Sequence, residues 1–97
     1  MAVQRIPGNV RRRSEFAGPS ELARFFRGER LEVIPRREVD RAACLAYIAG
    51  RFEPGREYPE AEVNSLLLSA YDDVALIRRY LVDAGLLRRA NNVYRRA

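Results

Sequence analysis

Residues 78–96 read RRYLVDAGLLRRANNVYRR, and this stretch decides the fold. Its first half has apolar residues at helical spacing and reaches Gly85, a residue type that commonly ends helices in a left-handed conformation. Its second half predicts two short strands, residues 86–90 and 93–96. Asn91-Asn92 lies between them, and asparagine tolerates the positive φ of a tight turn. The stretch therefore predicts the end of a helix followed by a β-hairpin.

Two short elements are predicted well upstream of this stretch. Ser20 is expected to cap a helix over residues 21–27, which Gly28 would end. Residues 30–34 alternate between polar and apolar types and precede Pro35. That pattern predicts a short edge strand, or an extended segment that docks on the core.

A longer helix is predicted over residues 36–51. Its apolar run, residues 42–49, favours a central helix that packs on several sides. Ala43 and Ala46 would then allow close approach by neighbouring elements. Residues 52–55 follow as a turn.

Two more helices complete the pattern before the hairpin. Residues 56–58 predict a single bridge of strand, and Pro59 suits the first position of the next helix. That helix has an apolar face made of Val63, Leu66, Leu67 and Ala70. Tyr71 would end it and Asp72 would cap the following helix, residues 73–84, after a break of two or three residues. Val74, Ile77, Leu81 and Ala84 would form the inward stripe of this last helix.

The order of these elements predicts an α+β fold that is mostly α. It matches a winged helix-turn-helix, with three core helices, a C-terminal hairpin as the wing and a short extra N-terminal helix. Residues 1–18 lack sustained periodicity, so we expect a flexible basic arm before a single domain over residues 19–97.

Three stretches also resemble a known bacterial family. They are RLEVIPRREVDRAACLAYIAGRF (30–52), FEPGREYPEAEVN (52–64) and YDDVALIRRYLVDAGLLRR (71–89), followed by a tyrosine in the hairpin. Together they resemble the domain of unknown function 2087 family over roughly residues 30–97. The resemblance implies a winged-helix-like fold, because family members are similar to winged-helix regulators and some accompany DNA-binding domains. Asn91-Asn92 departs from the family's glycine-containing turn, which leaves the conformation of the wing open.

Charge is unevenly distributed along the 97 residues, whose net charge is +5. Residues 1–37 carry nine arginines and four acids, residues 38–77 three arginines and eight acids, and residues 78–97 six arginines and one acid. Every basic residue is arginine, whose planar fork suits phosphates and guanine edges, although a GC-rich genome would also favour arginine. Basic ends around an acidic middle point to a polyanionic partner.

The candidate nucleic-acid contacts are arginines and one tyrosine. They are Arg78, Arg79, Arg88, Arg89, Tyr94, Arg95 and Arg96, with Arg11, Arg12 and Arg13 in the arm. On the helix, Arg79 is expected to pair with Asp83, and Arg78 to pack on the core edge while bonding an acid. On the hairpin, side chains alternate between faces, so Arg88 and one of the final arginines would share the exposed side near Tyr94.

One feature opposes contact between the last helix and bases. Recognition helices usually present their first turn to the major groove, and here that turn contains Asp72 and Asp73. Despite these two acids, the charge pattern and the predicted fold make the main expectation a nucleic-acid-binding protein. Duplex DNA is preferred over RNA as its ligand, and it would act in bacterial transcription regulation. Its contacts would be mainly electrostatic, through the hairpin arginines. The alternative is a protein-interaction or homodimerisation module that binds no nucleic acid.

Other function classes find little support in the composition. The chain has no histidine, the commonest general base and a common zinc ligand, so we expect no enzyme, metal site or cofactor. Cys44, the single cysteine, lies in an apolar run and is expected in the core. No apolar run reaches 18 residues and no signal-peptide pattern is visible, so the default expectations are a cytoplasmic location and no membrane partner.

Overall fold

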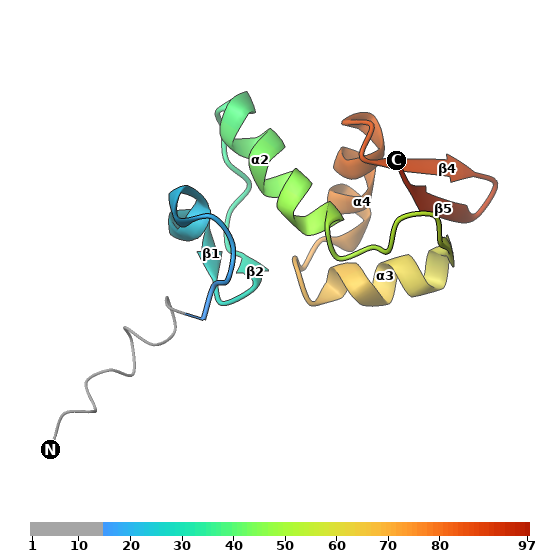
Figure 1. Cartoon of the computed structure of the whole chain (residues 1–97), viewed down its shortest axis with the longest axis horizontal. Coiled ribbons are helices and arrows are strands. Elements are labelled where there is room, and N and C mark those ends of the chain that lie inside the picture. The colour runs from blue at the N-terminus through green and yellow to red at the C-terminus, as the bar shows by residue number, and fades with distance from the viewer. Residues whose placement is uncertain (1–14) are drawn as a thin grey trace, which may run out of the picture.

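The computed structural model describes residues 15–97 and shows an α+β fold, as predicted (Figure 1). The helices are the 3-10 helix η2 (Ser20–Phe25) and the α-helices α2 (Glu38–Ala49), α3 (Glu60–Leu68) and α4 (Val74–Asp83). The strands are β1 (Phe26–Arg27), β2 (Arg30–Leu31), β3 (Glu57–Pro59), β4 (Leu87–Ala90) and β5 (Val93–Arg96).

The strands form two antiparallel sheets. β1 and β2 make a two-stranded sheet, and the other three strands form a sheet in the order β3-β5-β4. The predicted hairpin is confirmed, with Ala90 opposite Val93 across a turn in which Asn91 has a φ of 59°. Gly85 has a φ of +77° between α4 and β4, so the predicted left-handed helix stop is also confirmed.

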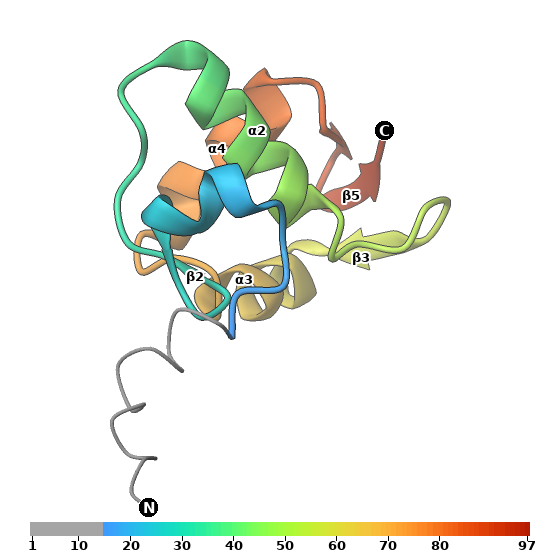
Figure 2. The same ribbon diagram turned by 60° about the vertical axis from the view of Figure 1, so that its left-hand side comes forward.

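One continuous core joins the helices to the three-stranded sheet. α2 contacts η2 on one side and α4 on the other, while α3 packs against α4 and β3 (Figures 1 and 2). Buried side chains come from each of these elements, and the most deeply buried include Ile48, Val63, Leu67, Ile77, Leu81, Leu87 and Tyr94. This packing fixes α4 next to the β4-β5 hairpin.

An aromatic cluster attaches the N-terminal elements to α2. The rings of Phe16 and Phe26 stack with centroids 4.6 Å apart. The rings of Phe26 and Tyr47 meet edge to face, with centroids 5.5 Å apart. Phe16 belongs to the predicted arm, yet it is buried. Residues 15–18 therefore pack with the domain.

The prediction for the first helix is wrong in detail. η2 is a 3-10 helix without a side-chain cap from Ser20, and the chain leaves it at Phe26 in an extended conformation. Gly28 does not end a helix; its φ of +60° lies in the turn between β1 and β2. Pairing with Phe26-Arg27 also limits the predicted strand over 30–34 to two residues, of which Leu31 reaches the core.

The predicted packing of α2 on several sides is confirmed in part: α2 contacts η2 and α4, but it is not buried all round. Cys44, Leu45, Ile48 and Ala49 are buried, but Ala42, Ala43 and Ala46 face solvent. The apolar run predicted a buried helix because alanine counts as apolar, although alanine is also the residue most compatible with an exposed helix surface.

The connection between α3 and α4 is longer than predicted. It spans residues 69–73 rather than two or three residues. Asp73, not Asp72, caps α4, and its side chain accepts a hydrogen bond from the backbone N–H of Leu76 at 3.1 Å. Pro59 lies one position before the first helical residue of α3, as the last residue of β3.

Of the helices in residues 15–97, none is both long and apolar enough to span a lipid bilayer.

Candidate nucleic-acid interface

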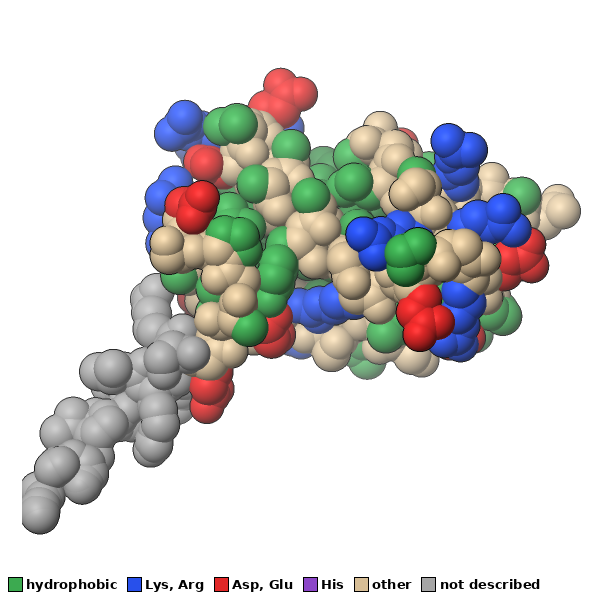
Figure 3. Space-filling view, in the orientation of Figure 1, with side chains coloured by type: hydrophobic (Ala, Val, Ile, Leu, Met, Phe, Trp, Pro, Cys, Tyr) green, Lys and Arg blue, Asp and Glu red, His purple; other side chains and the backbone are tan. Residues whose placement is uncertain are grey.

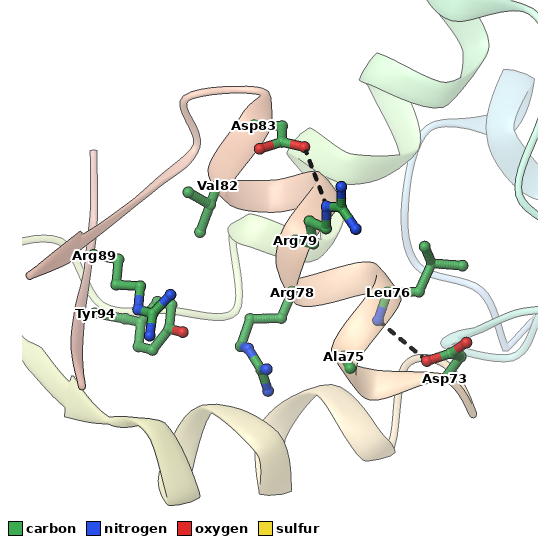
Figure 4. Close-up of a pocket in the computed structure, with 9 residues that line it drawn as sticks. All are labelled: Asp73, Ala75, Leu76, Arg78, Arg79, Val82, Asp83, Arg89 and Tyr94. Carbon is green, nitrogen blue, oxygen red and sulfur yellow. Dashed lines mark hydrogen bonds and ion pairs between the residues drawn. The ribbon is translucent and has the colours of Figure 1, made fainter. Parts of the chain in front are cut away.

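A groove of about 580 Å³ lies between α4 and the β4-β5 hairpin (Figure 4). Its lining combines two carboxylates, three arginines, a tyrosine and small apolar side chains. These residues are Asp73, Ala75, Leu76, Arg78, Arg79, Val82, Asp83, Arg89 and Tyr94. The structure thus brings four of the predicted contact residues, from the helix and from the hairpin, to one place.

The periodicity of α4 decides which side chains reach this groove. Ile77 and Leu81 are completely buried against the core. At about 100° per residue, Arg79 points almost directly away from them, and Ala75 lies one turn before it on the same side. The outward face of α4 is therefore available to a ligand.

Arg78 bridges α4 and α3. It is half-buried, and its Nη1 donates a hydrogen bond to Oδ1 of Asn64 on α3. In Figure 4 its side chain points from α4 toward α3. The predicted position at the core edge is confirmed, but the partner is an amide rather than an acid. The full positive charge of Arg78 is therefore not neutralised by this bond.

The predicted pairing of Arg79 with Asp83 is confirmed, in a weak form. Nε of Arg79 lies 3.9 Å from Oδ2 of Asp83, and the two side chains are 80% and 68% exposed. Ion pairs this exposed contribute about 0–1 kcal/mol. An incoming phosphate can therefore compete for Arg79 at little cost.

Arg89 and Tyr94 lie directly opposite each other on β4 and β5, so they share one face of the sheet. The exposed guanidinium of Arg89 lies 5.9 Å from the centroid of the Tyr94 ring, and its Nε donates to the carbonyl of Asn91 at 3.0 Å. Tyr94 is only 2% exposed. The prediction that Arg88 and one of the final arginines share an exposed side is confirmed for Arg88 and Arg95. Its placement of Tyr94 near that side is wrong, because the ring fills the core side of the sheet.

The hydroxyl of Tyr94 connects the hairpin to α3. It donates to Oε1 of Glu60 at 2.8 Å. Burial raises the pKa of Tyr94 above its ordinary value, and the hydrogen bond to Glu60 raises it further. The charges of Arg78 and Arg89 act in the opposite direction on this pKa. The phenol therefore stays protonated as a donor in the floor of the groove.

Arg88 and Arg95 lie on the opposite face of the sheet, directly across from each other. Nη2 of Arg95 donates to Oε2 of Glu57 on β3 at 2.8 Å. Arg96 returns to the Tyr94 face, where its Nη1 donates to the backbone carbonyl of Phe52 at 3.0 Å. The hairpin arginines therefore do not form one surface.

Both carboxylates at the start of α4 have partners. Asp73 caps the helix, and Asp72 forms an ion pair with Arg30. Nη1 of Arg30 also donates to the carbonyl of Leu68 at 2.8 Å, which ties β2 to the α3-α4 connection. The ion pair reduces the repulsion that the sequence predicts between Asp72 and a polyanion, whereas Asp73 keeps its negative charge.

Three residues of this site were missed by sequence reasoning. Glu60 and Asn64 lie one turn apart on α3, a spacing that could have placed them on one helix face. Arg30 pairs with Asp72 from a position 42 residues away, and no local pattern indicates such a contact. Of the predicted site residues, Arg11, Arg12 and Arg13 lie outside the described residues.

Arginines gather over the hairpin end of the molecule, with acidic side chains between them (Figure 3). Within residues 15–97, no group of three or more metal-binding side chains is close enough together to hold an ion. Cys44 is buried as predicted, and burial raises the pKa of its thiol to about 11. The described residues thus present a charged groove beside α4.

A family model described as "uncharacterized protein conserved in bacteria" (DUF2087) matches residues 30–96, which is more than half of the chain. The chain belongs to this family. The matched DUF2087 region contains α2, α3, α4 and the whole three-stranded sheet, so the groove lies inside it. No curated protein and no solved structure gives a significant match.

Proposed function

We propose that this DUF2087 protein is a winged-helix domain that binds nucleic acid, with duplex DNA as the preferred ligand, and acts in bacterial transcription regulation. The order α2-β3-α3-α4-β4-β5, with β5 between β3 and β4, supports the fold. In this arrangement α4 is the helix that faces the nucleic acid, and the β4-β5 hairpin is the wing.

The observation that carries the proposal is the groove between these two elements. Arg78 and Arg79 reach it from α4, and Arg89 reaches it from the hairpin. Among the described residues, Arg78 and Arg89 form no ion pair with a carboxylate, and the pair of Arg79 is weak. Three guanidinium groups, on α4 and on the β4-β5 hairpin, can contact phosphates on both sides of a bound DNA duplex.

Affinity in this proposal comes mainly from phosphate contacts. Each phosphate that an arginine neutralises releases condensed counterions, so binding weakens steeply with salt. Three contacts predict a log–log slope of about −2.7, or about a 40-fold loss of affinity between 50 and 200 mM salt. Little base readout is required for binding of this kind.

The test is a salt titration of the protein with random-sequence duplex DNA, followed by fluorescence anisotropy. The parent protein should show the steep slope, and a variant with Arg78→Gln, Arg79→Gln and Arg89→Gln should lose most of the affinity and most of the slope. The matched control replaces three exposed arginines that do not line the groove: Arg24, Arg36 and Arg37. Equal losses in the two variants, or no binding by the parent at low salt, would refute the proposal.

A second candidate, self-association, rests on a different surface. The exposed face of α2 carries Val39, which is 64% exposed, together with Ala42, Ala43 and Ala46. Small side chains allow two helices to approach closely in a symmetric dimer. Molar mass from size-exclusion chromatography at two salt concentrations tests this candidate. A dimer that Ala43→Glu dissociates supports it, and a monomer at both concentrations rules it out.

A further inference from the structure

The first two turns of α3 hold both elements that border the groove. The backbone N–H of Glu60 donates to the carbonyl of Asn92 in the hairpin turn at 2.9 Å, and its carboxylate accepts the hydroxyl of Tyr94. Asn64 lies one turn later on the same side of α3 and accepts a hydrogen bond from Arg78 of α4. α3 therefore fixes the hairpin through Glu60 and the guanidinium of Arg78 through Asn64.

The partner of Arg78 is a neutral amide, although a carboxylate of nearly the same size would bond a guanidinium more strongly. Both side chains are half-buried, so solvent screens charge less here than on the open surface. An amide oxygen accepts an N–H and leaves the positive charge unpaired, whereas a carboxylate would neutralise it. Burial raises the pKa of Tyr94 and the charge of Arg78 lowers it, so this charge acts at the floor of the groove.

The bond to Asn64 also leaves donors for a ligand. A guanidinium has five N–H groups in one plane, and Asn64 accepts from Nη1 alone. Arg78 lines the groove, and its side chain points from α4 toward α3 (Figure 4). A phosphate oxygen can therefore accept from other N–H groups of Arg78 while the bond to Asn64 remains. A long side chain that is already ordered reduces the entropy cost of binding.

We infer that Asn64 is a positioning residue for the phosphate contact of Arg78: its amide holds the guanidinium at the groove and leaves the positive charge for the polyanion. The inference rests on the proposed function, because it requires Arg78 to contact a DNA phosphate. A carboxylate at this position would hold Arg78 equally well, but a phosphate would then have to compete with an ion pair.

The experiment compares Asn64→Asp with the parent in salt titrations with random-sequence duplex DNA. Aspartate has the size and the acceptor oxygen of asparagine and adds a negative charge, so it should keep Arg78 in place and neutralise it. Loss of one phosphate contact lowers the log–log slope by about 0.9. Between 50 and 200 mM salt, affinity should then fall about 12-fold, against about 40-fold in the parent. The parent slope in Asn64→Asp would overturn the inference.

Two controls show whether the effect passes through Arg78. Ser65→Asp adds the same charge at the next position of α3, which is exposed and does not line the groove, and it should keep the parent slope. In a protein that already carries Arg78→Gln, Asn64→Asp should change the slope no further, because the contact is already lost. Equal reductions in Ser65→Asp and Asn64→Asp, or additive reductions in the double variant, would overturn the inference.

Asn64→Leu tests the positioning by itself. Leucine has a similar size and accepts no hydrogen bond, so Arg78 keeps its charge and loses its anchor. The parent slope should remain, while binding should weaken about two- to tenfold, the cost of ordering one long side chain. Parent affinity in this variant would show that the bond to Asn64 does not position Arg78.

The failures of the two proposals can be told apart. Salt-dependent binding by the parent with an equal slope in Asn64→Asp overturns the role of Asn64 and leaves DNA binding intact. No binding by the parent at low salt overturns the proposed function and the inference with it.

Discussion

The two faces of the β3-β5-β4 sheet differ sharply although both receive arginines from the same strands. One face carries Tyr94 and Arg89, of which the tyrosine is buried and the arginine borders the groove beside α4. The other carries Arg88 and Arg95, with Glu57 as their acidic neighbour. Side chains that are adjacent in the sequence therefore enter two different environments.

Two adjacent arginines on a strand therefore do not belong to one binding surface. Alternation sends one member of each pair to each face. On the groove face, the charge of Arg89 adds to those of Arg78 and Arg79 from α4. On the outer face, Glu57 offsets part of the charge through its ion pair with Arg95. The groove face is therefore the better phosphate-binding surface.

The largest expected difference between the two faces is in how much a substitution lowers the stability of the protein. Tyr94→Ala should lower the free energy of unfolding by about 3–5 kcal/mol, because it removes a fully buried aromatic ring. Arg95→Ala, one residue later, should cost only about 0–1 kcal/mol, because its ion pair with Glu57 is exposed. Urea denaturation of both variants measures the two values, and similar losses would contradict the assignment of the faces.

A smaller effect is expected at the groove end of α4. Asp73→Ala should destabilise the protein by about 1 kcal/mol through loss of the helix cap, whereas Asp73→Asn should be nearly neutral because asparagine also caps helices. Thermal denaturation of the two variants gives the comparison. Equal losses of stability in the two variants would show that the hydrogen bond between Asp73 and the N–H of Leu76 does not stabilise the protein.

The same position distinguishes the faces by charge. Asp73→Asn removes a negative charge from the lining of the groove and should strengthen DNA binding at low salt. Glu57→Gln removes the same charge from the outer face and should change affinity less. Anisotropy titrations of both variants check this order. A larger gain for Glu57→Gln would indicate that DNA lies on the outer face.

The smallest effect concerns the pH dependence of stability. The pKa of Tyr94 is raised in the folded protein, so above pH 10 the unfolded chain releases this proton first. The contribution of Tyr94 to the free energy of unfolding is fully present below the unfolded pKa of about 10. It is lost as pH rises through the folded pKa. Tyr94→Phe should therefore show a shallower fall in unfolding free energy above pH 10. An unchanged pH profile in this variant would show that Tyr94 does not contribute.

Much of the fold could be predicted because it depends on local patterns. The stripe of Ile77 and Leu81, the stop at Gly85 and the hairpin around Asn91-Asn92 each follow from short-range rules and agree with the structure. The N-terminal elements could not be predicted in this way. Phe26 is extended rather than helical, and it packs in an aromatic cluster with residues distant in the sequence. Tertiary packing decided that region.

The site could be predicted only in part for the same reason. The ion pair of Arg79 with Asp83 lies within one helix, so spacing was enough to find it. The bond of Arg78 to Asn64 and the burial of Tyr94 depend on how α3, α4 and the hairpin pack together. Alternation predicted that the hairpin arginines divide between two faces, but not which face borders α4.

The most direct test of the groove account compares Arg89→Gln with Arg88→Gln. The two variants remove one charge each from neighbouring positions of β4, and only Arg89 lines the groove beside α4. Salt titrations with duplex DNA should show that Arg89→Gln reduces the log–log slope by about 0.9, the contribution of one phosphate contact, and that Arg88→Gln leaves the slope unchanged. Equal reductions in both variants, or a reduction only in Arg88→Gln, would contradict binding through this groove.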